Sequence, residues 1–466
     1  MNLSRRKLLI ASGVAGTTLT ARSWTSLVRG NVPSNRIRVG VIGTGVRGKY
    51  LIGNLPESAR VEAICDCATS RMADTLKPKA EFKEILAGFE SEQARHCSTH
   101  HDYRKMLDEV KLDAVIIATP DHHHVQAAMQ ALHAGLDVYL EKPLSLTIRE
   151  GRLLADAVKA TGRVLQVGSQ QRTMAVNRFA CEFIRDGGLG KITRVDVPNY
   201  PGPMTMPSFA EQPAPDGLHW DLFLGAAPQR PHHRKLWIKD EFKVGGLLWR
   251  GWDLYRDYSG HLMTNWGGHN IDMVQYALGM DDAGPIKVEL LRDVSEAALA
   301  KDWEKKWHKK TPKPDGAFAD DSRFAPIRMT YAGGIEMNFM PDVATATFYG
   351  ERGHMTIARN KYKCTPQNLI KNAPDSSAME QWDAGGHVAR PHLQNWLDCI
   401  RSRREPNAPV EVGHRSATVC HLANIARDLG RTLHWNPESE QFTSDAEANR
   451  LLERPRREGY QLPGVS

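Results

Sequence analysis

The sequence predicts an α/β protein in which a doubly wound parallel sheet is followed by a large, mostly antiparallel sheet. Strand-like and helix-like segments alternate from Ile37 to Val167 with short turns between them, which is typical of a parallel sheet with helices on both faces. The alternation stops after about residue 170, and segments of alternating polarity follow within residues 286–357, which is typical of antiparallel strands. A chain of 466 residues is also long enough for two domains.

Each predicted element of the first sheet has a local signal. Short β-rich or apolar runs predict five strands, at residues 37–42, 61–65, 113–118, 138–140 and 164–167. Helical patterns follow two of them, at residues 125–134 and 147–161. Residues 77–100 are charged and irregular, so we expect an insertion there that is helical in part. Near the C-terminus, amphipathic patterns predict helices over residues 391–404 and 414–430.

The net charge of +7 is concentrated at the N-terminus. Residues 1–30 hold five basic residues and no acidic one, so the rest of the chain carries +7 minus 5, or +2. A nearly neutral body has no basic footprint for nucleic acid. Arg5 and Arg6 precede a small-residue, moderately apolar stretch that resembles a twin-arginine signal and is too short for a confident membrane span. We expect export to the periplasm or beyond by the twin-arginine machinery, with a retained membrane anchor or an accidental arginine pair as the open alternatives.

A glycine-rich segment directly follows the first predicted strand and opens a helix. It reads Gly43-Thr44-Gly45-Val46-Arg47-Gly48. In this context the glycines permit a tight turn, close approach of a pyrophosphate to the backbone, and close packing of the helix. Asp66, at the end of the second strand, is placed to accept hydrogen bonds from ribose hydroxyls. The segment predicts NAD, although the nearby Arg71 leaves NADP possible.

Two further strand tips carry polar residues. The third strand ends in Thr119-Pro120-Asp121-His122-His123-His124. Adjacent histidines point in different directions, so we expect no metal site, and we expect Thr119, Pro120 and His124 to line the cofactor cleft. The fourth strand ends in Glu141-Lys142-Pro143. Partial burial beside a positively charged nicotinamide ring lowers the pKa of a lysine, so Lys142 is a candidate acid/base, with a surface ion pair to Glu141 as the alternative.

A fourth group of candidates lies in the C-terminal half. His269 and Asp272 are three residues apart in Asn265-Trp266-Gly267-Gly268-His269-Asn270-Ile271-Asp272, so on a helix they share a face. An imidazole and a carboxylate placed in this way can handle a proton and orient a hydroxyl group. Taken alone, a histidine in the core with satisfied hydrogen bonds explains the pattern better.

Together these motifs resemble the glucose–fructose oxidoreductase/inositol dehydrogenase (Gfo/Idh/MocA) family. The resemblance rests on the order of G-x-G-x-x-G, A-T-P-D-H, E-K-P, Q-V-G-x-Q-x-R (Gln166 to Arg172) and G-x-H-x-x-D, from about Ile37 to at least Gly430. Residues 220–225 and 413–415 look like the family's secreted, twin-arginine branch. The resemblance implies a Rossmann domain over residues 36–168 and a C-terminal domain over residues 169–466 that contacts substrate and builds a dimer or tetramer.

The resemblance also implies roles for single residues. Lys142 lies beside nicotinamide and substrate, and the Lys142–Pro143 bond is commonly cis in the family. His269 is the acid/base or the hydroxyl partner, and the candidates for cofactor or substrate contact include Glu141, Gln170, Arg172, Asn265 and Asp272. Many members have Asp where this chain has Asn265. An amide cannot take a proton, so the proton role falls on Lys142 and His269.

Three functions remain open at this point. The first is an exported NAD(P)-dependent oxidoreductase acting on a sugar, polyol or related carbohydrate. The second is an NAD-dependent glycoside hydrolase that works by transient oxidation and elimination. The third is a carbohydrate-binding protein without catalysis, which only Asn265 supports. Four side chains could stack on a sugar ring or belong to the core: Trp249, Arg250, Trp252 and Tyr255.

Overall fold

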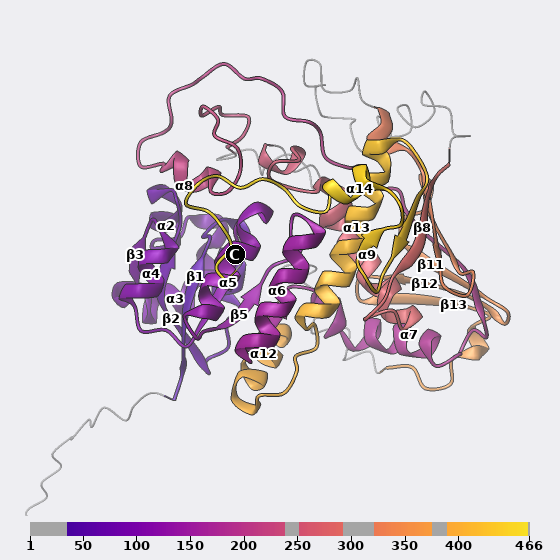
Figure 1. The fold of residues 1–466 in the computed structure, drawn as a ribbon. Helices are drawn as coiled ribbons and strands as arrows, with labels where there is room; N and C mark the ends of the chain where they lie inside the picture. Colours follow the sequence, from indigo (N-terminus) through magenta and orange to yellow (C-terminus); the bar gives the residue numbers. More distant parts are fainter. Residues whose placement is uncertain (1–34, 238–250, 292–320, 375–388, 465–466) are drawn as a thin grey trace, which may run out of the picture. The chain divides into compact units, whose positions relative to one another are not determined.

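Two β-sheets organise the chain (Figure 1). The computed structural model describes residues 35–237, 251–291, 321–374 and 389–464. The predicted signal segment, Trp249 and Arg250 lie outside these ranges. Residues Arg36–Ser466 form one compact unit, separate from Met1–Asn35.

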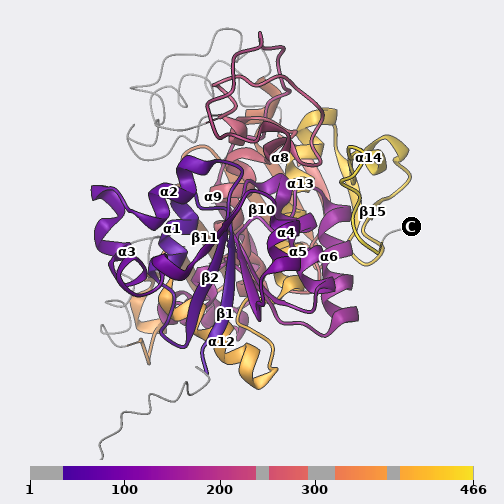
Figure 2. The same cartoon turned by 90° about the vertical axis from the view of Figure 1, so that its left-hand side faces the viewer.

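The N-terminal sheet has six parallel strands in the order β3-β2-β1-β4-β5-β6. Two of them, β1 and β2, lie side by side in Figure 2. This is the strand order of dinucleotide-binding sheets. The strands are added outward in one direction from β1 to β3 and in the other direction from β4 to β6, so the order of the strands reverses between β1 and β4. The elements of this part are β1 (Ile37–Ile42), α1 (Val46–Gly53), β2 (Ala59–Cys65), α2 (Thr69–Leu76), α3 (Ala80–Glu92), β3 (Ser98–His100), α4 (Tyr103–Glu109), β4 (Ala114–Ile117), α5 (His124–His133), β5 (Asp137–Leu140), α6 (Ile148–Thr161) and β6 (Leu165–Val167).

Helices cover both faces of this sheet, which is why its central strands are buried almost throughout. Helices α5 and α6 pack on one face, and α1 and α3 pack on the other. The five predicted strands are confirmed as β1, β2, β4, β5 and β6. The sixth, β3, falls in the segment predicted to be an insertion. It is a short edge strand of polar residues, so it lacks the apolar signal that reveals a buried strand.

The second sheet has nine strands in the order β13-β12-β11-β7-β10-β9-β8-β14-β15. Within the described residues, its neighbouring strands are antiparallel except for the parallel pair β7–β10, which confirms the predicted mostly antiparallel sheet. The elements here are α7 (Ala175–Arg185), β7 (Ile192–Pro198), α8 (Trp220–Leu224), α9 (His261–Leu278), β8 (Pro285–Leu290), β9 (Ile327–Tyr331), β10 (Glu336–Met340), β11 (Ala346–Gly350), β12 (Gly353–Ala358), β13 (Lys361–Thr365), α12 (Arg390–Ser402), α13 (Val410–Leu429), β14 (Leu433–Asn436), β15 (Gln441–Phe442) and α14 (Ala446–Arg450).

Helices α12 and α13 join the two sheets. The predicted pair of C-terminal helices is confirmed, with α13 starting earlier than its pattern indicated. Trp396 and Leu397 of α12 pack into the core beneath the N-terminal sheet, although the sequence assigned them to the C-terminal domain. Helix α13 packs against both α6 and α9. These two helices therefore fix the carboxyl end of β5 relative to α9, where the candidate catalytic residues lie.

Two further properties concern export and redox state. No helix in the described ranges has the length and apolar character needed to span a bilayer. The seven cysteines, all of which the structure describes, are free thiols.

Candidate active site

The glycine loop between β1 and α1 has the backbone geometry that its sequence predicts. Gly43 has a φ of +92°, and a side chain there would meet the Ala118 carbonyl oxygen at 2.6 Å. A Cβ atom on Gly48 would lie 2.0 Å from the Gly43 carbonyl oxygen. At Gly45 only Arg71 Nη1 comes near, at 3.8 Å. The loop is therefore closed where the helix packs on it and open at Gly45, where a pyrophosphate would approach the backbone.

Asp66, which follows β2, is hydrogen-bonded to Thr44 of the glycine loop. Its Oδ2 atom accepts hydrogen bonds from the Thr44 backbone N–H at 2.8 Å and the Thr44 hydroxyl at 3.1 Å. Its Oδ1 atom accepts from the Ala68 N–H at 3.0 Å. Asp66 is buried, and the weak contact of the Cys67 thiol with Oδ1, at 3.7 Å, is the one that a stronger donor could replace. The carboxylate is thus held rigidly at the end of β2, where a ribose would lie.

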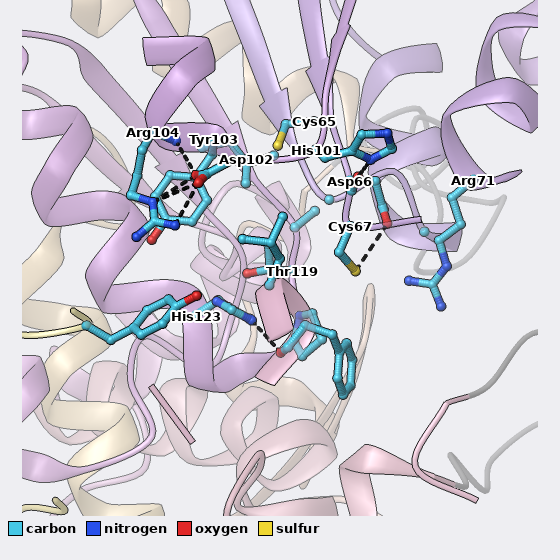
Figure 3. A pocket seen from close by; sticks show the side chains of 18 residues that line it. Cys65, Asp66, Cys67, Arg71, His101, Asp102, Tyr103, Arg104, Thr119 and His123 are labelled. Atoms are coloured by element: carbon cyan, nitrogen blue, oxygen red, sulfur yellow. Dashed lines mark hydrogen bonds and ion pairs between the residues drawn. The ribbon is translucent and has the colours of Figure 1, made fainter. Parts of the chain in front are cut away.

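A pocket opens beside Asp66 (Figure 3). Its walls come from the glycine loop, the ends of β2 and β4, and segments after residue 169 that include Phe223 and Tyr460. Thr119 and Pro120 line it, as the sequence predicted. The Thr119 hydroxyl oxygen is buried there without a hydrogen-bond partner. An open glycine loop, a held carboxylate and an orphaned hydroxyl fit a dinucleotide.

Arg71 lies at the same pocket (Figure 3). Its guanidinium carbon lies 4.1 Å from the centre of the Trp237 ring, a cation–π contact. This contact holds the cation near Gly45. The structure therefore places both the carboxylate that favours NAD and the arginine that leaves NADP possible at one edge of the pocket.

The tip of β5 is tied to the glycine loop. Arg47 donates to a carboxylate oxygen of Glu141 at 2.7 Å, and the Glu141 side chain is 7% exposed. The Lys142–Pro143 peptide bond is cis, which confirms the bond that the family resemblance implied. The imidazole nitrogens of His124 face the Pro143 and Thr119 carbonyl oxygens at 2.7 and 3.0 Å. Burial lowers the pKa of His124, so its neutral imidazole has one N–H and donates to one of these carbonyl oxygens. Its predicted contact with the cofactor gains no support from these positions.

Lys142 meets helix α9 at Asn265. Its ammonium Nζ donates to Asn265 Oδ1 at 2.7 Å. Burial lowers the pKa of Lys142, and the charges of nearby acids raise it in part. An amide oxygen accepts this hydrogen bond without adding a negative charge, so it orients the lysine and leaves its pKa lowered. The arrangement therefore makes Lys142 easier to deprotonate than an exposed lysine.

His269 lies one turn further along α9. Burial lowers the pKa of His269 well below its usual value, and the positive charges of Arg359 and Lys142 lower it further. The imidazole is therefore neutral at working pH, and it serves better as a hydrogen-bond partner of a hydroxyl than as a proton donor. Of the two roles implied for His269, the electrostatics favour the hydroxyl partner.

A buried network behind Lys142 was not recognised in the sequence. Ser259 Oγ lies 2.8 Å from Asp121 Oδ2 and 3.1 Å from Asp253 Oδ1, and it accepts the His261 N–H at 3.0 Å. One hydroxyl hydrogen can be donated to only one carboxylate, so both contacts are hydrogen bonds only if the other carboxyl holds a proton. Burial and the charge of Asp253 raise the pKa of Asp121 to about 7. The charges of both acids act on Lys142.

Backbone strain supports a functional origin for this network. His261 has a φ of 55°, in the left-handed region that non-glycine residues rarely adopt. This conformation places its Nδ1 atom 3.2 Å from Asp253 Oδ2. No local pattern in the sequence marks the network, because Asp121 is 138 residues from Ser259. Of the aromatic residues in this loop that could stack on a sugar, Tyr255 is buried in a core cluster against which Trp252 packs.

Arg172 and Asp272, both predicted to contact substrate, contact each other. Arg172 Nε lies 2.9 and 3.0 Å from the two carboxylate oxygens of Asp272, and its other nitrogens reach Asp281. Ser416 donates to Asp272 at 2.9 Å. The Arg172 and Asp272 side chains are 4% and 2% exposed. This ion pair holds α9 against the segment after β6, which indicates a positioning role, and direct contact with substrate stays a prediction. Gln170, predicted to contact the cofactor, is buried in the same segment.

The three adjacent histidines do not converge on one point. His122 and His123 both direct Nε2 at the Phe223 carbonyl oxygen, at 2.9 and 2.8 Å, while His124 faces other carbonyls. Among the described residues, no three His, Cys, Asp or Glu side chains are grouped to hold a metal ion.

The family is shown by two sequence models that together match most of the chain. The model of the Gfo/Idh/MocA oxidoreductase family with an NAD-binding Rossmann fold matches residues 37–169. The model of the C-terminal alpha/beta domain of the same family matches residues 204–313 and 361–462. The protein belongs to the Gfo/Idh/MocA oxidoreductase family and has its NAD-binding domain, which confirms the resemblance at the level of the family and the NAD prediction.

Curated relatives match mainly one part of the chain. The scyllo-inositol 2-dehydrogenase (NAD(+)) of Bacillus subtilis (strain 168) is 30% identical over 158 residues, which is 34% of this chain and 42% of that protein. The Glycosyl hydrolase family 109 protein 2 of Shewanella sp. (strain ANA-3) is 32% identical over 177 residues, 34% of this chain and 38% of that protein. The chain thus spans less than half the length of these relatives.

Solved structures match the fold more completely. The WlbA dehydrogenase from Bordetella pertussis, in complex with NADH and UDP-GlcNAcA, has a TM-score of 0.53 and 18% identity, covering 86% of this chain and 99% of that one. The scyllo-inositol dehydrogenase from Lactobacillus casei, with bound NAD(H) and scyllo-inositol, has a TM-score of 0.52 and 16% identity, with coverage of 86% and 99%. At this identity the likeness establishes the two-sheet fold.

Proposed function

We propose that the protein is an exported NAD-dependent oxidoreductase that acts on a hydroxyl group of a sugar, polyol or related carbohydrate. The hydrogen bond between Lys142 and Asn265 carries this proposal. It holds an amine with a lowered pKa at the carboxyl end of β5, the position in a doubly wound sheet where substrates meet the cofactor. Family membership and the dehydrogenases among its relatives support the same reading.

The residues divide the work of a dehydrogenation. The glycine loop and Asp66 would hold NAD, which would supply the acceptor for a hydride from the carbon that carries the hydroxyl. Neutral Lys142 accepts the hydroxyl proton, so that the C–O bond becomes a carbonyl, and protonated Lys142 returns the proton in the reverse direction. Asn265 fixes the direction of the lysine, and neutral His269 holds the hydroxyl by a hydrogen bond.

The first test is to purify the protein, denature it, and identify any released nucleotide by mass. We expect stoichiometric NAD or NADH and, with the intact protein, a change in the nicotinamide absorbance when an inositol or a sugar from a panel is added. A protein that contains no nucleotide and does not bind added NAD or NADP would overturn the proposal.

One relative favours a second candidate. The family 109 glycosyl hydrolase makes a hydrolase that uses NAD by transient oxidation, elimination and re-reduction the alternative. The same Lys142 would then take and return the proton within one turnover. Cleavage of an aryl glycoside without added cofactor, and without net change in the bound nicotinamide, would separate this activity from dehydrogenation.

We further propose that the twin-arginine machinery exports the protein folded with its cofactor, and that it acts as a dimer or tetramer. Arg5 and Arg6 before the apolar stretch support export. Export of a folded protein suits a site that must keep NAD outside the cytoplasm. Replacing both arginines with lysine should retain the protein in the cytoplasm, as cell fractionation would show. Light scattering of the purified protein tests the oligomer.

A further inference from the structure

Arg359 lies in the turn between β12 and β13, and a buried side chain fixes this turn on both sides. Asn177 of α7 donates to the Ala358 carbonyl oxygen at 2.9 Å and accepts the Asn360 N–H at 2.7 Å. Asn177 is fully buried, and Asn360 has a left-handed φ of 55°. A turn held in this way presents Arg359 in a defined direction, although no motif in the sequence marks it.

The Arg359 guanidinium has buried donors without a hydrogen-bond partner. Its Nε and Nη1 atoms are shielded from solvent and bond to none of the described residues. The centre of the Trp266 ring lies 5.8 Å from the guanidinium carbon. Buried polar groups without partners are rare in native proteins, and a guanidinium stays charged. The side chain therefore suits a partner that the described residues do not supply.

The charges around Arg359 show what kind of partner is missing. Its positive charge lowers the pKa of His269, so the guanidinium acts directly on the candidate catalytic site. Burial and the charge of Arg47 lower the pKa of Arg359 to about 10, and Glu141 offsets this only in part. Glu141 is already bound to Arg47 at 2.7 Å. Within the described residues, the positive charge of Arg359 is therefore balanced only in part.

We propose that Arg359 binds an anionic group of the substrate, so that the substrate is a carbohydrate bearing a carboxylate or a phosphate. The planar guanidinium fork matches either anion through two parallel hydrogen bonds. Trp266 and His269, on the same face of α9 and 5.9 Å apart between ring centres, would lie beside the sugar ring. This inference rests on the proposed function, because it assigns the substrate class of the same site.

Another anion in the region is the pyrophosphate of the dinucleotide. The glycine loop and the N-terminus of α1 already provide backbone donors for it, and Gly45 leaves that approach open. If Arg359 served the cofactor, its loss would reduce nucleotide retention and leave the preference among sugars unchanged. The two sources of negative charge can therefore be separated by measuring both quantities on one variant.

The test compares matched ligands on the protein with its resident nucleotide. The pairs are glucose with glucuronate, galactose with galacturonate, and glucose with glucose 6-phosphate, and binding is measured by calorimetry at constant ionic strength. We expect at least one anionic member to bind more tightly than its neutral partner. In Arg359→Gln this preference should fall by about ten- to a hundredfold, with neutral sugars and nucleotide content unchanged.

Two further variants keep the test decisive. Arg359→Lys retains the positive charge but loses the planar guanidinium, so it should keep part of the preference for anionic sugars. If Arg359→Gln does not fold, the lysine variant replaces it in the test. Arg352→Gln removes an exposed arginine from the neighbouring turn between β11 and β12 and should change nothing.

The outcomes separate this inference from the proposed function. Equal binding within every pair, no binding by any anionic member, or nucleotide loss in Arg359→Gln with an unchanged sugar preference would each overturn the inference. Oxidation of neutral polyols without a preference for anions would support the proposed function and contradict the inference about Arg359. Anionic sugars that bind through Arg359 and never change the absorbance of the nicotinamide would contradict the oxidoreductase proposal instead.

Discussion

The ammonium Nζ of Lys142 lies 2.7 Å from Oδ1 of Asn265. This hydrogen bond connects the end of β5 in the parallel sheet to α9 of the C-terminal domain. The two residues are 123 positions apart in the chain. Helices α12 and α13 hold the two parts together, and this bond joins the end of β5 to α9. The neutrality of Asn265 matters most, because burial lowers the pKa of Lys142 and the amide does not counteract it.

Asn265→Asp tests this relationship. A carboxylate at 2.7 Å from the ammonium should raise the pKa of Lys142, and an opposite charge this close shifts a pKa by about 1 to 3 units. Oxidation needs the neutral amine, so its pH profile should move to higher pH by at least about one unit. Asn270→Asp adds the same charge to the same helix, where Asn270 bonds Tyr200, and should shift the profile less. Equal profiles for wild type and Asn265→Asp would contradict the assignment of Lys142 as the base.

The Asp121–Ser259–Asp253 network should add a second titration. Burial and the charge of Asp253 raise the pKa of Asp121 to about 7. As pH rises through this value, Asp121 ionises, and its charge raises the pKa of Lys142. Asp121→Asn stays neutral and can still donate to Ser259, so Lys142 should lose its proton more readily. We expect the oxidation profile to shift to lower pH.

A suitable control for this variant is Asp257→Asn. Asp257 lies on the same loop but pairs with Arg230 at 2.8 Å. Its replacement should leave the profile in place. The pH dependence of Lys142 acylation, followed by mass spectrometry, measures the same shift without catalysis. A profile that Asp121→Asn leaves unchanged would show that the network does not influence the lysine.

The parallel sheet and its strand tips could be predicted from the sequence because their signals are local. Buried strands are continuous apolar runs, and the glycine loop, Asp66, Thr119 and Lys142 each follow directly after one. Strand β3 was missed for the opposite reason, because an exposed three-residue strand contains no apolar pattern. The mostly antiparallel sheet was predicted from alternation, but its strand order depends on contacts between distant segments.

The sequence does not predict which side chains the site residues contact. Nothing in the spacing of Arg172 and Asp272 reveals that they neutralise each other across 100 residues. Ser259 and Asp253 lie in a loop whose sequence is marked by aromatic residues and not by a catalytic motif. Arg359 lies in the turn between β12 and β13, which has no recognisable motif. The packing of the two sheets decides which polar side chains face one another. Short sequence motifs do not contain this information, because the contacts join distant segments.

Replacing two glycines of the loop with alanine should separate cofactor binding from folding. At Gly45 an added Cβ meets only Arg71 Nη1, at 3.8 Å, so Gly45→Ala should fold normally and lose most of the nucleotide. At Gly48 the Cβ would lie 2.0 Å from a backbone oxygen, so Gly48→Ala should also cost about 1–3 kcal/mol of stability. Released nucleotide and thermal unfolding measure the two effects.

The control for the loop variants lies in helix α3. A Cβ on Gly88 meets nothing within 4 Å, so Gly88→Ala should stabilise the helix by about 0.5–1 kcal/mol and leave the nucleotide content unchanged. Full nucleotide retention in Gly45→Ala would mean that the dinucleotide does not approach this backbone.

The last prediction concerns Glu440, which joins α6 and α13 through ion pairs. His414 Nε2 and Arg152 Nη2 lie 2.8 and 2.6 Å from its Oε1 atom. Burial raises the pKa of Glu440, but hydrogen bonds from His414 and Arg152 outweigh this and lower it to about 2. A glutamate in an unfolded chain has a pKa of about 4.3. The stabilisation is therefore complete above about pH 4.3 and is lost as the pH falls through the folded value.

Glu440→Gln should accordingly lower the free energy of unfolding by about 2 kcal/mol at neutral pH, and by less at pH values below about 3. Denaturant unfolding at several pH values measures the difference. Glu438→Gln removes an exposed carboxylate from the same turn and should have little effect at any pH. A loss of stability in Glu440→Gln that is the same at neutral and acidic pH would show that packing of the side chain, and not its charge, connects the two helices.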